Sequence, residues 1–135
     1  MEDRLQKLLG GTNNGVLTTI KRDGRPQLSN VNFTYADGMI RISVTDGRAK
    51  TANLRRDPRA SFYVTTGDFG SYAVAEGTAT LTPVATDPTD ATVEELIDVY
   101  RAISGEHPDW DEYRAAMVTD RRMVLRLAVS RIYGA

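Results

Sequence analysis

Short runs in which apolar and polar residues alternate, separated by glycine turns, constrain the fold of this chain most strongly. The run at 39–45 reads MIRISVT, and its apolar residues alternate with polar ones as in a strand that buries one face. Asp-Gly turns at 23–24 and 37–38 separate it from two earlier β-rich runs. We therefore predict a three-stranded antiparallel meander over residues 15–44, with a polar face that is available to line a site.

Three further β-rich runs follow, at residues 60–66, 71–83 and 123–134. Gly77 lies inside the second of these runs, which indicates a bulge or a bend. The total is about six mostly antiparallel strands, and such a sheet in a small chain best avoids exposed edges by closing into a barrel. Strands and helices do not alternate throughout, so a doubly wound parallel fold is excluded. The expected fold class is mainly β (α+β), an antiparallel barrel with peripheral helices.

Two short helices are expected in the first half of the chain. Leu5 and the leucines at 8–9 share one face at helical spacing, and the glycines at 10–11 follow where such a helix would end. Good helix formers at 49–56 predict about two turns, which Asp57–Pro58 ends.

Two longer helices are expected in the second half. The first follows Thr89, where the periodicity changes, and Thr92 with Glu95 matches a capping box. Its apolar residues recur at helical spacing: Val93, Leu96, Ile97, Tyr100 and Ile103. The second is marked by Trp110, Tyr113 and Met117.

Composition limits the class of protein. A chain of 135 residues is expected to form one domain, residues 1–135. Its 17 Lys and Arg residues balance 18 acidic ones, so the basic excess of a general nucleic-acid binder is missing. There is no cysteine, the first residues carry mixed charge, and no apolar run reaches the roughly 20 residues that span a bilayer. We expect a cytoplasmic protein without a nucleic-acid or membrane partner.

Catalytic and metal-ligating residues are scarce. His107 is the only histidine, so a two-histidine metal site cannot form, and no glycine stretch matches a P-loop or a dinucleotide fingerprint. The carboxylates at 109–112 lie at an expected helix start, where the positive end of the helix dipole already accounts for them. We predict no metal site and no catalytic side chain.

Five cations gather between Arg48 and Arg59, and the expected helix divides them. Arg55, Arg56 and Arg59 lie at or beyond its C-terminal end, where cations are favoured by about 0.3–1 kcal/mol each without any ligand. A structural role explains these three arginines.

Arg48 and Lys50 lie instead at the start of that helix, where the dipole disfavours cations. A phosphate there would gain charge-assisted hydrogen bonds of about 1.5–3 kcal/mol each, and Ser43 and Thr45 of the preceding strand would point nearby. The alternative is a short basic turn that is merely solvated. From spacing alone, an anion site and a solvated turn both remain open.

Five stretches of the sequence carry a family resemblance: GVLTTIKRDGRPQLSNV, RISV, RAKTANLRRDPRASFYV, SYAVAEGTATLTP and GEHPDWDEYRAAMVTDRR. In these stretches the chain resembles the deazaflavin (coenzyme F420) dependent oxidoreductases of the split β-barrel superfamily, relatives of the FMN-dependent pyridoxamine 5'-phosphate oxidases. The resemblance covers nearly the whole chain and is most specific in the block that begins at Arg48. It implies a homodimer of split barrels with cofactor sites in clefts at the subunit interface.

The resemblance also implies the cofactor-binding residues. Arg48 and Lys50 match phosphate-binding cations, and Asn53 follows on the same helix. The other matches lie beside the expected ring: Ser43, Val44, Gln27, Ser29, Asn30, Gly70, Ser71 and Tyr72. From periodicity alone, by contrast, Val44 is a core residue and Tyr72 a packing aromatic.

The activity implied by the resemblance needs no side-chain nucleophile. Coenzyme F420 carries the redox chemistry, and the protein binds and orients it for hydride transfer to a small electron-poor organic substrate. One alternative is an FMN-binding flavoprotein like the pyridoxamine 5'-phosphate oxidases. The other is a non-catalytic protein that binds or stores F420.

Overall fold

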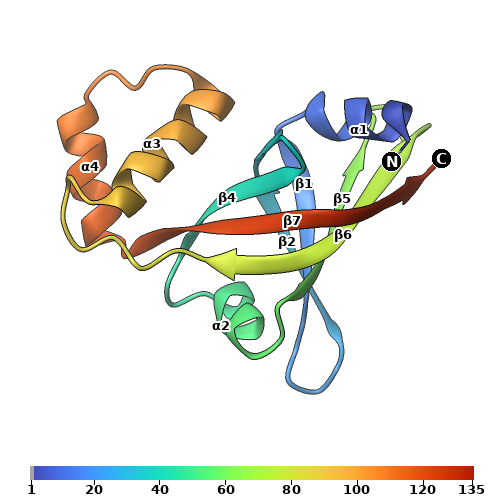
Figure 1. Ribbon diagram of the computed structural model, residues 1–135, viewed down its shortest axis with the longest axis horizontal. Helices are drawn as coiled ribbons and strands as arrows, with labels where there is room; N and C mark the ends of the chain where they lie inside the picture. Colours follow the sequence, from blue (N-terminus) through green and yellow to red (C-terminus); the bar gives the residue numbers. More distant parts are fainter. Residues whose placement is uncertain (1) are drawn as a thin grey trace.

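The computed structural model describes residues 2–135, which form four helices and seven strands (Figure 1). In chain order these are α1 (Asp3–Gly10), β1 (Asn14–Ile20), β2 (Pro26–Asn32), β3 (Thr34–Ala36), β4 (Met39–Thr45), α2 (Ala49–Arg56), β5 (Arg59–Thr65), β6 (Tyr72–Leu81), α3 (Ala91–Ser104), α4 (Trp110–Thr119) and β7 (Arg122–Gly134).

One curled antiparallel sheet forms a half-barrel, in the order β2-β1-β5-β6-β7-β4-β3. Every neighbouring pair is antiparallel. The mainly β (α+β) class with peripheral helices is therefore confirmed, with seven strands among residues 2–135 rather than about six. The order begins with β2 and ends with β3, so the barrel stays open between these two ends of the sheet.

The predicted meander over 15–44 is wrong, because its second run breaks at Phe33. β2 pairs only with β1, whereas β3 pairs with β4 at the opposite end of the sheet. Phe33 is fully buried, and its ring lies 4.5 Å from that of Phe62 in an edge-to-face contact. Burying this ring turns the chain inward, and the run crosses from one edge of the sheet to the other.

The main core lies inside the curled sheet. Ile40, Ile42 and Val44 of β4 are 0%, 1% and 1% exposed, as their alternation predicts. Leu5 and Leu9 bury the apolar face of α1 over one end of the barrel, where α1 packs on β3, β5, β6 and β7 (Figure 1).

The bulge predicted at Gly77 is confirmed. The register between β6 and β7 shifts between Glu76 and Gly77, and a Cβ at Gly77 would collide with the carbonyl of Ala128. Only glycine allows the two backbones to approach so closely at this position.

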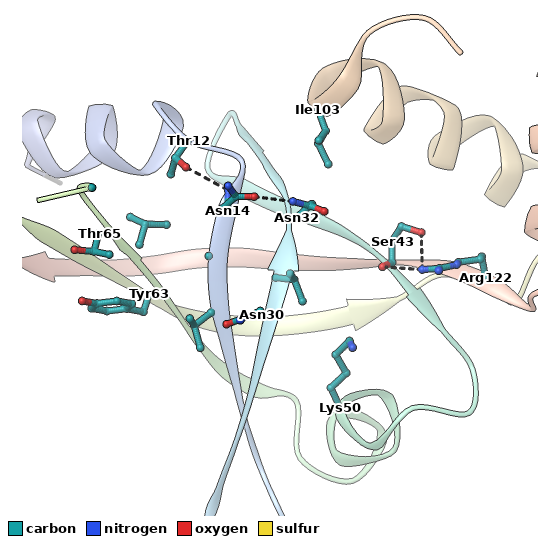
Figure 2. A pocket seen from close by; sticks show the side chains of 15 residues that line it. Thr12, Asn14, Asn30, Asn32, Ser43, Lys50, Tyr63, Thr65, Ile103 and Arg122 are labelled. Carbon is teal, nitrogen blue, oxygen red and sulfur yellow. Dashed lines mark hydrogen bonds between the residues drawn. The ribbon is translucent and has the colours of Figure 1, made fainter. Parts of the chain in front are cut away.

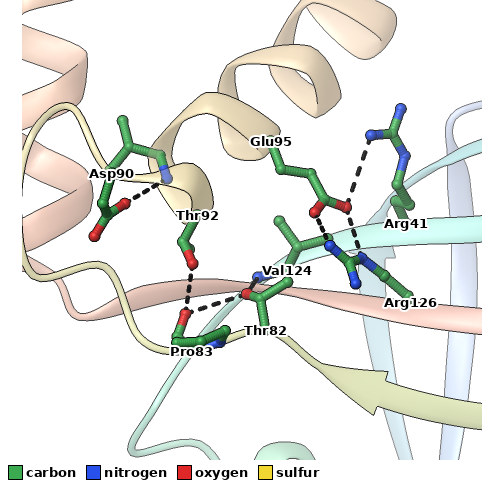
Figure 3. A network of polar contacts seen from close by, with 9 residues as sticks. Arg41, Thr82, Pro83, Asp90, Thr92, Glu95, Val124 and Arg126 are labelled. Carbon is green, nitrogen blue, oxygen red and sulfur yellow. Dashed lines mark hydrogen bonds and ion pairs between the residues drawn. The ribbon is translucent and has the colours of Figure 1, made fainter.

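The two late helices form a second apolar cluster beside the sheet (Figure 1). The N-cap of helix α3 lies two residues before the predicted Thr92, because Asp90 accepts a hydrogen bond from Val93 N–H at 2.9 Å. The predicted capping box of Thr92 and Glu95 is therefore wrong. Thr92 instead donates its hydroxyl to the carbonyl of Pro83 at 2.8 Å (Figure 3).

Glu95 fastens α3 to the sheet. Its half-buried carboxylate accepts hydrogen bonds from Arg126 of β7 and lies 3.8 Å from Arg41 of β4 (Figure 3). These arginines hold the pKa of Glu95 below its ordinary value. Across the part of the chain that the structure describes, none of the helices has the length and apolar character needed to cross a membrane.

Candidate functional site

An open cleft of about 860 Å³ lies at the opening of the half-barrel. It extends from β1, β2 and β5 on one side to β4, α2 and the start of β7 on the other (Figure 2). Ile103, near the end of α3, points toward it from above (Figure 2). The polar and aromatic side chains that line it are Thr12, Asn14, Asn30, Asn32, Ser43, Lys50, Tyr63, Thr65 and Arg122.

The free edge of β4 turns main-chain groups toward the cleft. Ser43 lies opposite Val124 in the β4–β7 ladder. The N–H of Val124 donates to the Thr82 hydroxyl at 2.9 Å, and its C=O accepts from the Thr82 N–H at 3.0 Å. Both main-chain groups of Val124 therefore bond Thr82 and not Ser43. In an antiparallel ladder, such a residue directs its own N–H and C=O to the other side. β3 pairs only with residues 39–41 of β4, and the main chain of Ser43 therefore faces the open edge.

Arg122 adds a partly buried cation to this edge. Its Nη1 makes two long contacts of 3.4 Å, to the carbonyl and the hydroxyl of Ser43, while its Nε is buried without a hydrogen-bond partner. Within residues 2–135, no carboxylate lies at ion-pair distance from it. A buried donor left unsatisfied costs about 1–3 kcal/mol, so this guanidinium lacks the anion that would satisfy it.

Lys50 points into the same cleft from the first turn of α2 (Figure 2). Burial lowers the pKa of its ammonium group, and the positive charges of Arg48 and Arg122 lower it further. Arg48 is the N-cap of α2 and makes no side-chain capping bond, and the first turn carries no acid. A bound anion would relieve the repulsion between these cations and satisfy the helix start.

The other three cations of the basic segment have partners inside the protein, as predicted. Arg55 binds Asp46, and Arg59 binds Asp57, whose pKa it lowers to about 2. Arg56 donates to the carbonyl of Ile20. The segment therefore divides as the helix dipole indicates. Arg55, Arg56 and Arg59 each have a side-chain partner, whereas within residues 2–135 no ion pair holds Arg48 or Lys50 at the start of α2.

Not all of the predicted cofactor residues face the cleft. Asn30, Ser43 and Lys50 line it together. Asn53 is 7% exposed, and its side chain donates to Thr19 at 3.1 Å and accepts from Arg56, so it holds α2 against β1.

The remaining predicted residues lie around the cleft. The Val44 side chain is in the core, which leaves only its main chain for a ligand. Gln27 and Ser29 lie further along β2, opposite Thr19 and Leu17 of β1. The other three predicted residues lie between the end of β5 and the start of β6: Gly70, Ser71 and Tyr72. Thr65 and Gly67, which precede them, line the cleft. The cofactor roles of all these residues, Arg48 included, stay predictions.

Several lining residues are not among those predicted from the sequence. Asn32 donates to the side-chain oxygen of Asn14 at 2.7 Å, and Tyr63 stacks on Tyr72 with ring centroids 5.9 Å apart. Arg122 is the most important omission, since it lies 79 residues from Ser43. The pair Arg121-Arg122 before the last strand is a visible signal, but only the register of β7 decides which arginine turns inward.

This donor set fits an anionic cofactor that also has a polar ring edge. Lys50 and Arg122 provide charge for a phosphate, and the free strand edge provides main-chain hydrogen bonds. Among the described lining residues there is no Asp, Glu or His to act as a general acid or base. His107 lies elsewhere, with its ring 5.2–5.6 Å from those of Tyr100, Tyr113 and Trp110.

A curled antiparallel sheet that stays open between two free edges, with cations gathered at the opening, defines the split β-barrel class. The chain belongs to the pyridoxamine 5'-phosphate oxidase family, whose model matches residues 1–134.

Solved structures share this fold. A conserved hypothetical protein from Mycobacterium tuberculosis has a TM-score of 0.76 at 25% identity, over 99% of this chain and 84% of that one. An F420 reductase has a TM-score of 0.71 at 23% identity, over 98% of both chains. A FAD-binding protein from Mesorhizobium loti has a TM-score of 0.70 at 18% identity, over 97% and 89%.

Proposed function

We propose that this protein is an F420-dependent reductase that binds the cofactor in the cleft and passes hydride to a small electron-poor organic molecule. The observation that carries the proposal is the pair of unneutralised cations, Lys50 and Arg122, beside the free main-chain edge of Ser43. Family membership supports an oxidoreductase. An F420 reductase of the same fold supports the choice of cofactor class.

The residues of the chain would bind and orient rather than react. Lys50 and Arg122 would hold the phosphate by charge-assisted hydrogen bonds, and the N–H of Ser43 would donate to the polar edge of the ring. When bound, a reduced deazaflavin supplies the hydride. Because the described lining has no acid, the proton that completes the product would come from water or from a second chain.

We further propose that a second copy of the chain covers the outer face of the sheet. Val16, Tyr63, Val74 and Tyr133 lie in one cross-strand row over β1, β5, β6 and β7. Leu28 of β2 and Tyr133 are 60% and 42% exposed, which favours a partner over water at this face. Sedimentation velocity tests this proposal, and a monomer at micromolar concentration would contradict it.

Titration of the protein with coenzyme F420 and with FMN tests the cofactor. We expect saturable F420 binding, and turnover of reduced F420 with a panel of enones, quinones and nitro compounds. Tight FMN binding without affinity for F420 would make the protein a flavoprotein instead, the alternative that the family itself supports. F420 binding without turnover across the panel would support the non-catalytic alternative.

A further inference from the structure

Phe69 occupies an unfavourable position in the turn between β5 and β6. Its φ angle is +65°, in the left-handed region, and its side chain is 78% exposed. A bulky residue rarely adopts this backbone conformation, and an exposed aromatic ring gains nothing from the core. Without a ligand, both the backbone conformation of Phe69 and the exposure of its ring are therefore unfavourable.

Glycines flank this position but do not occupy it. Gly67 and Gly70 belong to the same turn, and neither has a positive φ angle. Glycine would adopt the left-handed conformation without strain. The turn thus places an aromatic ring at its one left-handed residue, and strain of this kind is typical of functional sites.

Hydrogen bonds hold the backbone of this turn in place. Phe69 N–H donates to the carbonyl of Thr66 at 3.0 Å, and Gly70 N–H donates to the Asp68 carboxylate at 2.9 Å. The Thr66 hydroxyl donates to Asp68 at 2.6 Å and accepts from Ser71 N–H at 3.1 Å. None of these bonds uses the Phe69 side chain, so the turn would persist without the ring.

The turn borders the cleft. Thr65 and Gly67 line it, and Thr65 lies on the side opposite Lys50 and Arg122 (Figure 2). A ligand whose anion is held by these two cations would extend its remaining part toward the turn. Phe69 follows Gly67 by two residues and lies outside the cleft lining. Its exposed ring offers a flat apolar face, which recognises another planar ring by stacking.

We propose that Phe69 is a contact residue for the planar ring of the ligand that the cleft binds. This inference rests on the proposed function, since it assigns the ring of the same ligand to the turn. It adds a residue outside the matched Gly70–Tyr72 stretch, and it explains why the turn keeps a strained, exposed aromatic.

Phe69→Asn tests the contact, because asparagine adopts the left-handed conformation readily but has no ring. We expect its affinity for coenzyme F420, or for FMN if that is the bound cofactor, to fall about tenfold. Its affinity for inorganic phosphate should not change, because phosphate binds at the opposite side. Its Tm should rise by about 2–5 °C as the strain is relieved. Phe69→Tyr keeps the ring and the strain, so it should match the wild type in every measurement.

Equal cofactor affinity in the wild type and Phe69→Asn would overturn the contact and leave the proposed function intact. A change in sedimentation with unchanged cofactor affinity would also overturn it, and would assign Phe69 to a second copy of the chain. A wild-type protein that binds neither cofactor would remove both the proposed function and the contact.

Discussion

Replacing Arg122 with methionine should separate the stability of this protein from its ability to bind an anion. Methionine has a similar length but no charge, so Arg122→Met removes the buried Nε that has no hydrogen-bond partner. It also removes a positive charge that lowers the pKa of Lys50. Among residues 2–135, the only side-chain hydrogen bonds that it removes are two long contacts of 3.4 Å to Ser43.

The magnitudes follow from these contacts. An unsatisfied buried donor costs about 1–3 kcal/mol, so we expect the ligand-free variant to be about 1–2 kcal/mol more stable after the weak Ser43 contacts are discounted. For a chain of this length, that corresponds to a rise in Tm of about 4–8 °C. Loss of a charge-assisted hydrogen bond worth about 1.5–3 kcal/mol should weaken phosphate or cofactor binding about 10- to 150-fold.

Calorimetry can measure both quantities, through thermal unfolding of the ligand-free protein and titration with coenzyme F420 or inorganic phosphate. The matched control is Arg121→Met, which changes a 63% exposed side chain paired with Asp46. It should alter stability by less than about 0.5 kcal/mol and leave binding unchanged. A less stable Arg122→Met protein with unchanged affinity would refute the reasoning, because Arg122 would then be structural.

Three other substitutions test the remaining charges. Lys50→Ala should weaken cofactor binding at least about tenfold in a fluorescence titration. Arg56→Ala, which loses a structural contact to Ile20, should change cofactor binding little. Equal losses of affinity in the two variants would contradict the division of the basic segment. Glu95→Gln should destabilise the protein by about 1–3 kcal/mol at pH 7. Because the arginine partners of Glu95 hold its pKa below the ordinary 4.5, this contribution is fully present above pH 4.5 and is lost as the pH falls through the folded-state pKa. Denaturant unfolding at several pH values should therefore show the two proteins converging in acid, and a difference that persists at low pH would contradict the charge assignment.

Features set by neighbouring residues could be predicted from the sequence. The alternation in 39–45 identified a strand with one buried face, and β4 buries those side chains. The helix predicted at 49–56 is α2, and Gly77 marks a bulge. The helix dipole distinguishes Lys50, in the first turn of α2, from the arginines that end the helix. Each of these inferences depends on interactions within a few residues, which a local pattern records.

The helix start at Asp90 shows the limit of such patterns. Thr92 and Glu95 have the spacing of a capping box, but contacts with other elements use both side chains. Pro83 lies on the preceding loop and Arg126 on the last strand, so no local pattern could reveal either competitor.

The sequence by itself determined the strand-forming runs and the short basic helix, because these depend on local periodicity and residue type. Only the tertiary structure decided where the barrel opens and which cations meet there. Burial of Phe33 carries the chain from one edge of the sheet to the other, and the register of β7 turns Arg122 toward Ser43. Both outcomes depend on packing between residues far apart in the chain. The free energy of such contacts selects which residues meet, and no local pattern in the sequence records it.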